Sequence, residues 1–133
     1  FEAGVTTLLV DLLRAEDGEG RAYGAAALRA LMHGSVTRIK AACEAGAVAA
    51  LIAVLSSGPQ EARTQAVAAL QTLARPSNAL TRLVAADVAE LLVKGNSAGR
   101  KAAAILARQL GSVSPERQAV VMAACEAASE RTK

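Results

Sequence analysis

The stretch EAGAVAALIAVL (residues 44–55) repeats an earlier stretch, EAGVTTLLVDLL (residues 2–13), at an offset of 42 residues. The same offset places Arg21 on Arg63 and Leu28 on Leu70. A weaker third copy begins near residue 86, where the offset shortens. The sequence is therefore built from a repeated unit of about 41 residues, a period typical of solenoid folds.

Turn residues divide the central unit into three predicted helices, at residues 36–44, 47–56 and 59–75. Gly46 separates the first two, and the turn SSGP (residues 56–59) separates the second from the third. Apolar residues recur at helical spacing along the third of these helices, which gives it one buried face. No segment alternates apolar and polar residues over a useful length, so we predict no strands.

The composition fits closely packed helices. Of the 133 residues 53% are hydrophobic, yet there is one Tyr, one Phe and no Trp, and Ala is the most frequent residue. Alanines in the third helices allow close approach of neighbouring helices, and the leucines supply most of the apolar area that folding buries. The longest apolar stretches fall short of the roughly 18 residues that a membrane span requires, so we expect a soluble protein.

The net charge of +3 lies mainly in the last third of the sequence. It does not form the dense basic stripe of a dedicated nucleic-acid-binding protein, and aromatic residues for base stacking are nearly absent. We therefore expect no nucleic-acid partner.

Residue types for catalysis are scarce. His33 is the single histidine, and no motif places a nucleophile or carboxylate beside it, so we predict no catalytic site, metal site, cofactor or small-molecule substrate. Cys43 and Cys125 occupy equivalent positions two repeats apart, a separation of about 20 Å, which is too far for a disulfide. We expect both to be packing residues in a reducing compartment, and hence an intracellular protein of the cytoplasm or nucleus.

A three-helix unit of this length, with an acidic-small-Gly turn before the second helix and an Ala-rich third helix, resembles the armadillo repeat. The resemblance rests on the paired stretches EAGAVAALIAVLSSGP and QEARTQAVAALQTLA, and it implies a right-handed all-α solenoid over residues 1–133. The units are predicted at residues 1–34, 35–75 and 76–112, with a partial unit at 113–133. The middle copy is most similar to plant and protist armadillo proteins. HEAT repeats are the structural alternative, but they lack the separate short helix.

The first unit opens at the end of its first helix (residues 1–4), and the last helix is predicted at residues 115–129 after a Ser114 cap. In the third unit, Asp87 stands near the expected turn glycine. Neither end carries a polar capping repeat, so we expect a piece of a longer solenoid or a short one whose ends other chains cover.

In armadillo solenoids the third helices line a groove that holds extended peptides. The matching face here is predicted to bind the partner through Tyr23, Arg29, His33, Gln65, Thr72, Arg75, Lys101, Arg108 and Gln109, with Ala26, Ala30, Ala68, Gln71, Ala102 and Ile105 beside them. Its charged groups are all basic, which favours acidic segments. Three arginines occupy equivalent positions, at Arg21, Arg63 and Arg100. Either their guanidinium groups stack in a ladder, or their aliphatic stems lie across the Ala-rich helices with the charged heads in water.

We therefore predict a non-catalytic protein-interaction module that binds an extended acidic peptide or a partner helix along this groove. Two alternatives stay open. The chain is a structural layer of a permanent multi-subunit assembly, or it is the substrate-binding armadillo region of a U-box ubiquitin ligase.

Overall fold

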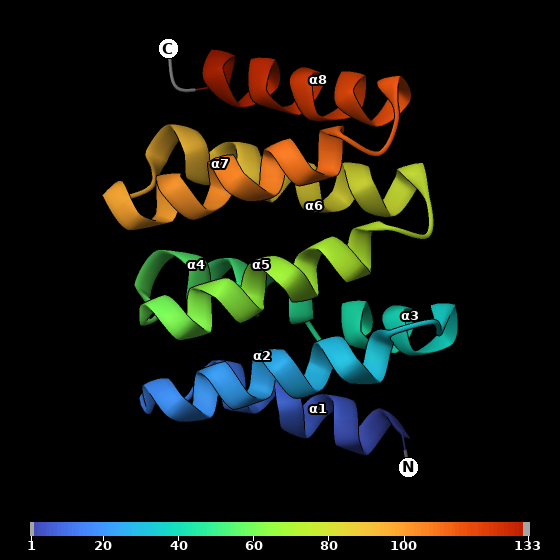
Figure 1. Ribbon diagram of the computed structural model, residues 1–133, viewed down its shortest axis with the longest axis vertical. Coiled ribbons are helices and arrows are strands. Elements are labelled where there is room, and N and C mark those ends of the chain that lie inside the picture. Colours follow the sequence, from blue (N-terminus) through green and yellow to red (C-terminus); the bar gives the residue numbers. More distant parts are fainter. Residues whose placement is uncertain (1, 132–133) are drawn as a thin grey trace.

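The computed structural model describes residues 2–131, which fold into eight α-helices without a strand. The helices are α1 (Glu2–Leu13), α2 (Gly18–Met32), α3 (Val36–Glu44), α4 (Ala47–Ser57), α5 (Gln60–Ala74), α6 (Asn78–Lys94), α7 (Ser97–Gly111) and α8 (Pro115–Arg131). They stack into an elongated body with the two ends of the chain at opposite poles (Figure 1). The predicted all-α solenoid is confirmed.

Two rows of helices build the stack. In the front row of Figure 1, α5 packs between α2 and α7. Behind them, α1, α4 and α6 each pack against the front helix of the same layer. The last helix, α8, packs mainly on α6. Each layer therefore contributes one of the three front helices to a continuous surface.

The central layer has the three predicted helices, with bounds within one residue of those expected. Gly46 has a φ of 90° and separates α3 from α4, which meet at 73°. A left-handed backbone of this kind favours glycine. Within the described residues no single helix is long and apolar enough to cross a membrane; this bent pair could do so by length and composition alone.

The first and third layers lack that bend, which corrects two details of the prediction. The expected break after Gly4 is absent, because α1 runs through it; Phe1 lies outside the described residues. The expected turn at Asp87 is also absent, and α6 continues for 17 residues. Glycine permits a turn without imposing one, and Asp87 would pay a steric cost in the left-handed conformation. The division into units at residues 1–34, 35–75, 76–112 and 113–133 stays a prediction.

Small residues bring the helices together in the core. Ala25, Ala66 and Ala103 are fully buried, one on each of the front helices. Leu28 and Leu70 are fully buried beside them, and each buried leucine contributes about 1.5–3 kcal/mol to folding. The alanine-rich composition thus supports close helix packing, as the sequence predicted.

The carboxyl end of α4 ties neighbouring layers together. We call residues 56–58 the α4 corner. Arg21 of α2 donates from Nη1 to Ser57 Oγ over 3.4 Å. Arg63 of α5 donates to the carbonyl oxygen of Gly58. Both arginines meet the carboxyl end of α4, where the helix dipole favours positive charge.

A third tie to the α4 corner comes from the layer above. Asn96 is the N-cap of α7, and its Oδ1 accepts a 2.8 Å hydrogen bond from the backbone N–H of Gly99. Its Nδ2 donates to the carbonyl oxygen of Ser56 over 2.9 Å. One side chain therefore begins α7 and fixes that beginning to the layer below.

The final helix is held to α6 at both ends. Asn78 donates to Glu116 over 2.9 Å and accepts from Arg117 over 3.1 Å. At the other end, Arg131 and Glu90 form an ion pair of 3.4 Å between half-exposed side chains. Because the paired residues are about one repeat apart in sequence, α8 continues the stacking of equivalent helices.

We expect Asn96→Ala to lower the free energy of unfolding by about 1–2 kcal/mol, because it removes both the cap and the interlayer hydrogen bond. Asn96→Asp keeps the capping acceptor and removes only the donor to Ser56, so its loss should be smaller. Urea unfolding of the two variants and the parent protein measures both effects. Equal losses would show that the cap contributes nothing.

Stability should also depend on the charge of Asp87. Burial, and secondly the negative charge of Glu90, raise the pKa of the Asp87 carboxyl. The folded state therefore binds this proton more readily than the unfolded state. The resulting penalty is present at neutral pH and disappears as the pH falls through the raised pKa.

Asp87→Asn should accordingly raise the free energy of unfolding at pH 7 by less than about 1 kcal/mol, since the side chain is only half-buried. Near pH 3 the gain in stability should vanish, because the Asp87 carboxyl of the parent protein is then protonated and, like the asparagine of the variant, neutral. Urea unfolding at the two pH values tests this, with Asp11→Asn on the exposed face of α1 as the control. A gain that persists at pH 3 would contradict the electrostatic cause.

Candidate functional site

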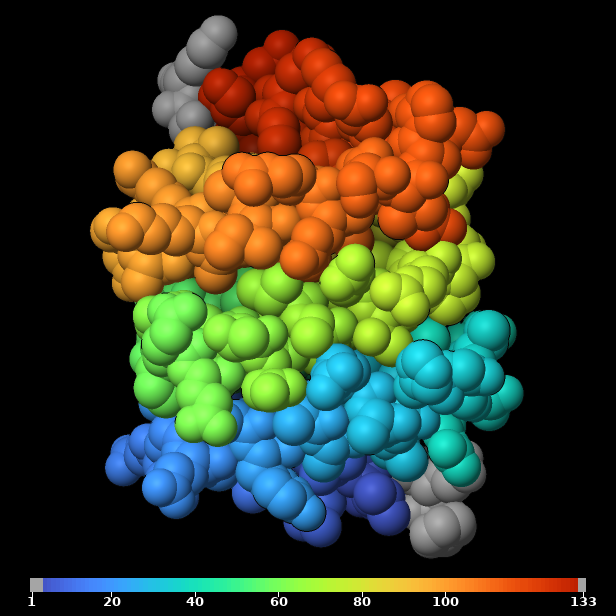
Figure 2. Space-filling model, viewed as in Figure 1, coloured from blue at the N-terminus to red at the C-terminus, as the bar shows by residue number. Residues whose placement is uncertain are grey.

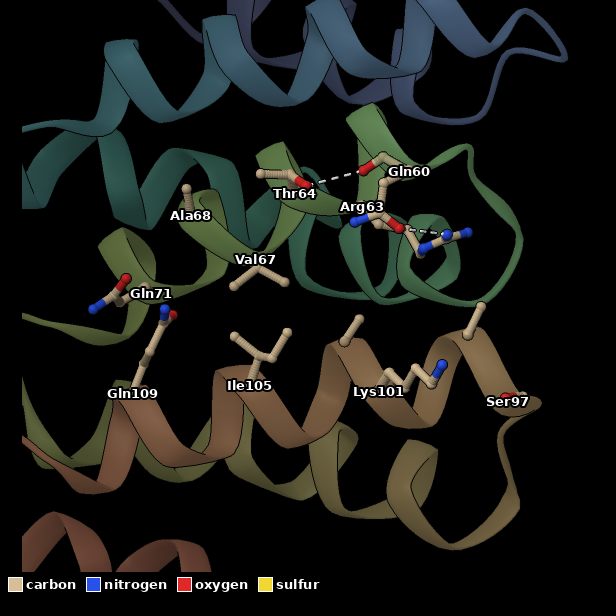
Figure 3. A pocket seen from close by; sticks show the side chains of 12 residues that line it. Gln60, Arg63, Thr64, Val67, Ala68, Gln71, Ser97, Lys101, Ile105 and Gln109 are labelled. Carbon is tan, nitrogen blue, oxygen red and sulfur yellow. Dashed lines mark hydrogen bonds between the residues drawn. The ribbon is translucent and has the colours of Figure 1, made fainter.

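A groove of about 620 Å³ lies between α5 and α7 on the face formed by the front helices (Figures 2 and 3). We call it the α5–α7 groove. Its lining from α5 is Gln60, Arg63, Thr64, Val67, Ala68 and Gln71, and its lining from α7 is Ser97, Ala98, Lys101, Ala102, Ile105 and Gln109. The volume falls in the range of sites that bind small molecules or short peptide segments.

Facing side chains form three successive pairs, here called rungs. The two helices lie side by side with the same direction, so each pair has one member on either wall (Figure 3). The rungs are the cationic rung (Arg63, Lys101), the apolar rung (Val67, Ile105) and the amide rung (Gln71, Gln109), and Gln60 and Ser97 line the amino-terminal end of the groove. The groove therefore presents a fixed order of chemical groups from one end to the other.

Side-chain size explains why the groove opens above α5 rather than below it. The 42-residue offset places Thr64 and Val67 of α5 on Ala22 and Ala25 of α2. These small residues let α2 and α5 pack more extensively than α5 and α7. Across the α5–α7 groove, Ile105 projects into the space with 48% of its side chain exposed. The larger side chains hold the two helices apart.

The amino-terminal end of the groove is positive. Arg63 and Lys101 are its charged lining residues, and both are cations. Arg63 also bonds to Gln60 Oε1 at 2.8 Å, whereas Lys101 is exposed and forms no hydrogen bond or ion pair within residues 2–131. The first turns of α5 and α7 lie at this end, and α5 has no side-chain cap there. Helix dipoles therefore add to the positive potential.

The opposite end of the groove is neutral and polar. Gln109 reaches from α7 toward Gln71 on α5 (Figure 3). Its Oε1 atom is buried and has no hydrogen-bond partner among the described residues. An unsatisfied buried acceptor costs free energy, so a rotamer of Gln109 that turns this oxygen toward a ligand donor in the groove would be favourable.

The structure places the nine residues of the predicted site on different surfaces. Lys101 and Gln109 line the α5–α7 groove, and among the residues predicted beside them Ala68, Gln71, Ala102 and Ile105 do so too. Gln65 and Thr72 are half-buried on the side of α5 turned away from the groove, and Thr72 Oγ1 donates to the carbonyl oxygen of Ala68. Tyr23 is exposed on α2.

Arg29, Arg75 and Arg108, predicted to give a basic groove, do not line it. Arg29 and Arg108 occupy the last turns of α2 and α7, and Arg75 is the C-cap of α5. Arg108 instead lines a separate hollow between α7 and α8, beside the exposed side chain of Met122. The basic groove charge comes from the other ends of the helices, through Arg63 and Lys101.

Sequence reasoning missed the contribution of Gln60, Arg63, Thr64, Val67 and Ser97. The predicted face was the one that points directly away from the core. Two neighbouring helices enclose a groove with the flanks that they turn toward each other. The sequence does contain a pattern that indicates this flank, because Gln60, Arg63, Thr64 and Val67 recur at intervals of three and four residues on α5.

The remaining predicted candidates have structural surroundings. His33 is the exposed C-cap of α2, and its backbone N–H donates to the carbonyl oxygen of Arg29. Cys43 and Cys125 are free, half-buried thiols that pack against the core. Burial raises the pKa of both thiols, and the nearby Glu44 raises that of Cys43 further, so the less nucleophilic thiol form is favoured. Residues 2–131 contain no group of three His, Cys, Asp or Glu arranged to hold a metal ion.

The three equivalent arginines have different roles. Arg21 and Arg63 bond to the α4 corner, and Arg100 is exposed on α7. The contact of Arg21 joins the first layer to the central one, and that of Arg63 joins α5 to α4 within the central layer, roles that neither expectation for these residues included.

Comparisons with known proteins agree with this architecture. Residues 38–75 match the family model of the Armadillo/beta-catenin-like repeat. Two crystal structures of engineered proteins from the Northeast Structural Genomics Consortium are similar, one at 26% identity and the other at 24%, each with a TM-score of 0.68. The match covers 90% of this chain in both cases, and 50% and 51% of the engineered chains. No curated protein matches the sequence.

The chain thus spans about half the length of these engineered proteins. The matched residues contain α4, α5 and most of α3, the layer whose bounds the sequence predicted best. The narrower likeness to plant and protist armadillo proteins stays a prediction. Residues 38–75 are an armadillo-type repeat within an all-helical solenoid, as the sequence indicated.

Proposed function

We propose that the protein is a non-catalytic interaction module whose α5–α7 groove binds an extended, net-acidic segment of another protein. The carrying observation is the charge of the groove: its two charged lining residues, Arg63 and Lys101, are both basic. An acidic segment would complement them and the positive helix ends beside them.

The fold supports a scaffold role. An armadillo-type repeat in a helical stack presents long, rigid surfaces built from equivalent helices, and such surfaces suit protein partners. The groove combines a central apolar rung with polar groups at both ends, an arrangement that excludes water from the middle and gives specificity at the ends. An intracellular location, in the cytoplasm or nucleus, is part of the proposal and rests on the two free thiols.

The proposal can be tested with a labelled ten-residue peptide that carries Glu and Leu among Gly and Ser residues. Lys101→Glu should weaken its binding by about tenfold, because repulsion replaces attraction beside the ligand. Fluorescence anisotropy measures the affinity, and added salt should weaken binding to the parent protein.

The matched control is Lys40→Glu, the same charge reversal on an exposed residue of α3 outside the groove. It should leave the affinity within about twofold of the parent value. If both variants weaken peptide binding equally, the groove is not the binding site. The same holds if a peptide with Lys in place of Glu binds as strongly as the acidic one.

A structural layer in a larger assembly is the second candidate. It is favoured by exposed apolar side chains on the terminal helices, Leu8 on α1 at 63% and Met122 on α8 at 56%. If this candidate holds, sedimentation velocity should show association that rises with concentration and is lost when Leu8→Glu and Met122→Glu are combined. A monomer at all concentrations would count against it. The substrate-binding role in a U-box ubiquitin ligase stays a prediction.

A further inference from the structure

We propose that the α5–α7 groove recognises a spacing: an acidic residue and an aliphatic residue separated by one residue in an extended peptide. This inference rests on the proposed function and specifies its ligand. It assigns the acidic side chain to the cationic rung and the aliphatic side chain to the apolar rung. Either order along the peptide satisfies the spacing.

The first step is the distance between rungs. Lys101, Ile105 and Gln109 follow one another at intervals of four residues on α7, and the same interval separates Arg63, Val67 and Gln71 on α5. Four residues of helix rise about 6 Å. In an extended chain, residues i and i+2 are about 6.6 Å apart and point to the same side. Alternate ligand residues therefore match successive rungs.

The second step is the chemistry of the cationic and apolar rungs. Lys101 is an exposed cation without a partner in the described part of the chain, so it can pair with a carboxylate. One interval further along, Ile105 exposes 48% of its side chain opposite Val67, which is 8% exposed. An aliphatic ligand residue placed there would cover Ile105 and contact Ala68 and Ala102 in the walls.

The third step distinguishes an extended ligand from a helical one. A helical ligand could match the same rungs with residues four apart, because its rise equals that of the walls. The amide rung favours the extended form. Gln71 and Gln109 are half-buried amides that line this end of the groove, and an extended backbone has free N–H and C=O groups for their exposed atoms to bond. The N–H groups of a helix interior are already bonded.

The experiment uses five labelled ten-residue peptides in a Gly/Ser background, four with one Glu and one Leu and one with Glu only. Three have Glu first, with the Leu one, two or four positions later, and a fourth reverses the order at the two-position spacing. The fifth has Glu alone. We expect one of the two-position peptides to bind the full chain at least fivefold more tightly than the one-position and four-position peptides.

Variants connect that preference to individual rungs. Ile105→Ala should reduce the advantage of the best peptide over the Glu-only peptide by at least threefold, whereas Leu83→Ala should leave it unchanged. Leu83 is the matched control, since it lies on α6 outside the groove and is also 48% exposed. Lys101→Glu should bind a copy of the best peptide with Lys in place of Glu more tightly than the original. Circular dichroism confirms that each variant is folded.

The outcomes separate this inference from the function on which it rests. If the acidic peptides bind and Lys101→Glu weakens them, but the spacing has no effect, the spacing rule is wrong while groove binding stands. If the peptide with the four-position spacing binds most tightly, the ligand binds as a helix and the extended form is wrong. If no acidic peptide of the set binds more tightly than its Lys counterpart, the proposed function fails together with the spacing rule.

Discussion

The arrangement of the front helices depends on one set of hydrogen bonds, those that converge on the α4 corner. Arg21, Arg63 and Asn96 approach residues 56–58 from the first, second and third layers. Each lies in the first turn or at the N-cap of a front helix. The corner therefore aligns the beginnings of α2, α5 and α7 along one edge of the stack. Because helices in register present their residues at equal heights, this alignment also produces the rungs of the groove.

Alanine packing determines how close the aligned helices come, and differences in size determine where they separate. Ala22 and Ala25 on α2 permit close contact with α5, and Gly18 lies so near Pro59 that an added Cβ would be 2.9 Å from its Cγ. Thr64 and Val67, at the equivalent places on α5, leave more bulk between α5 and α7. A repeat with identical alanines throughout would close both gaps. The departures from exact repetition therefore create the candidate site.

Much of the fold follows from the sequence because periodicity and turn residues are local signals. They gave the central layer to within one residue, since Gly46 and the SSGP turn both break helices in fact. They failed at Gly4 and Asp87, where a residue that resembles the turn position carries no requirement to bend. The site was harder to predict. Helical period identifies the face of one helix, whereas the groove depends on the flanks of two helices and on the distance between them. Lys101 and Gln109 were found, but Arg63 was considered only as a possible ladder residue.

The different fates of the basic residues follow from the direction of the helices. Arg29 and Arg108 lie in the last turns of α2 and α7, where their charge offsets the negative end of the helix dipole. Arg63 and Lys101 lie near the first turns of α5 and α7, where their charge adds to a positive end. Cations at the carboxyl ends thus reduce the local field, and cations at the amino ends increase it. The strongest attraction for a carboxylate is therefore at the corner end of the groove, although both ends of the helices carry arginine or lysine.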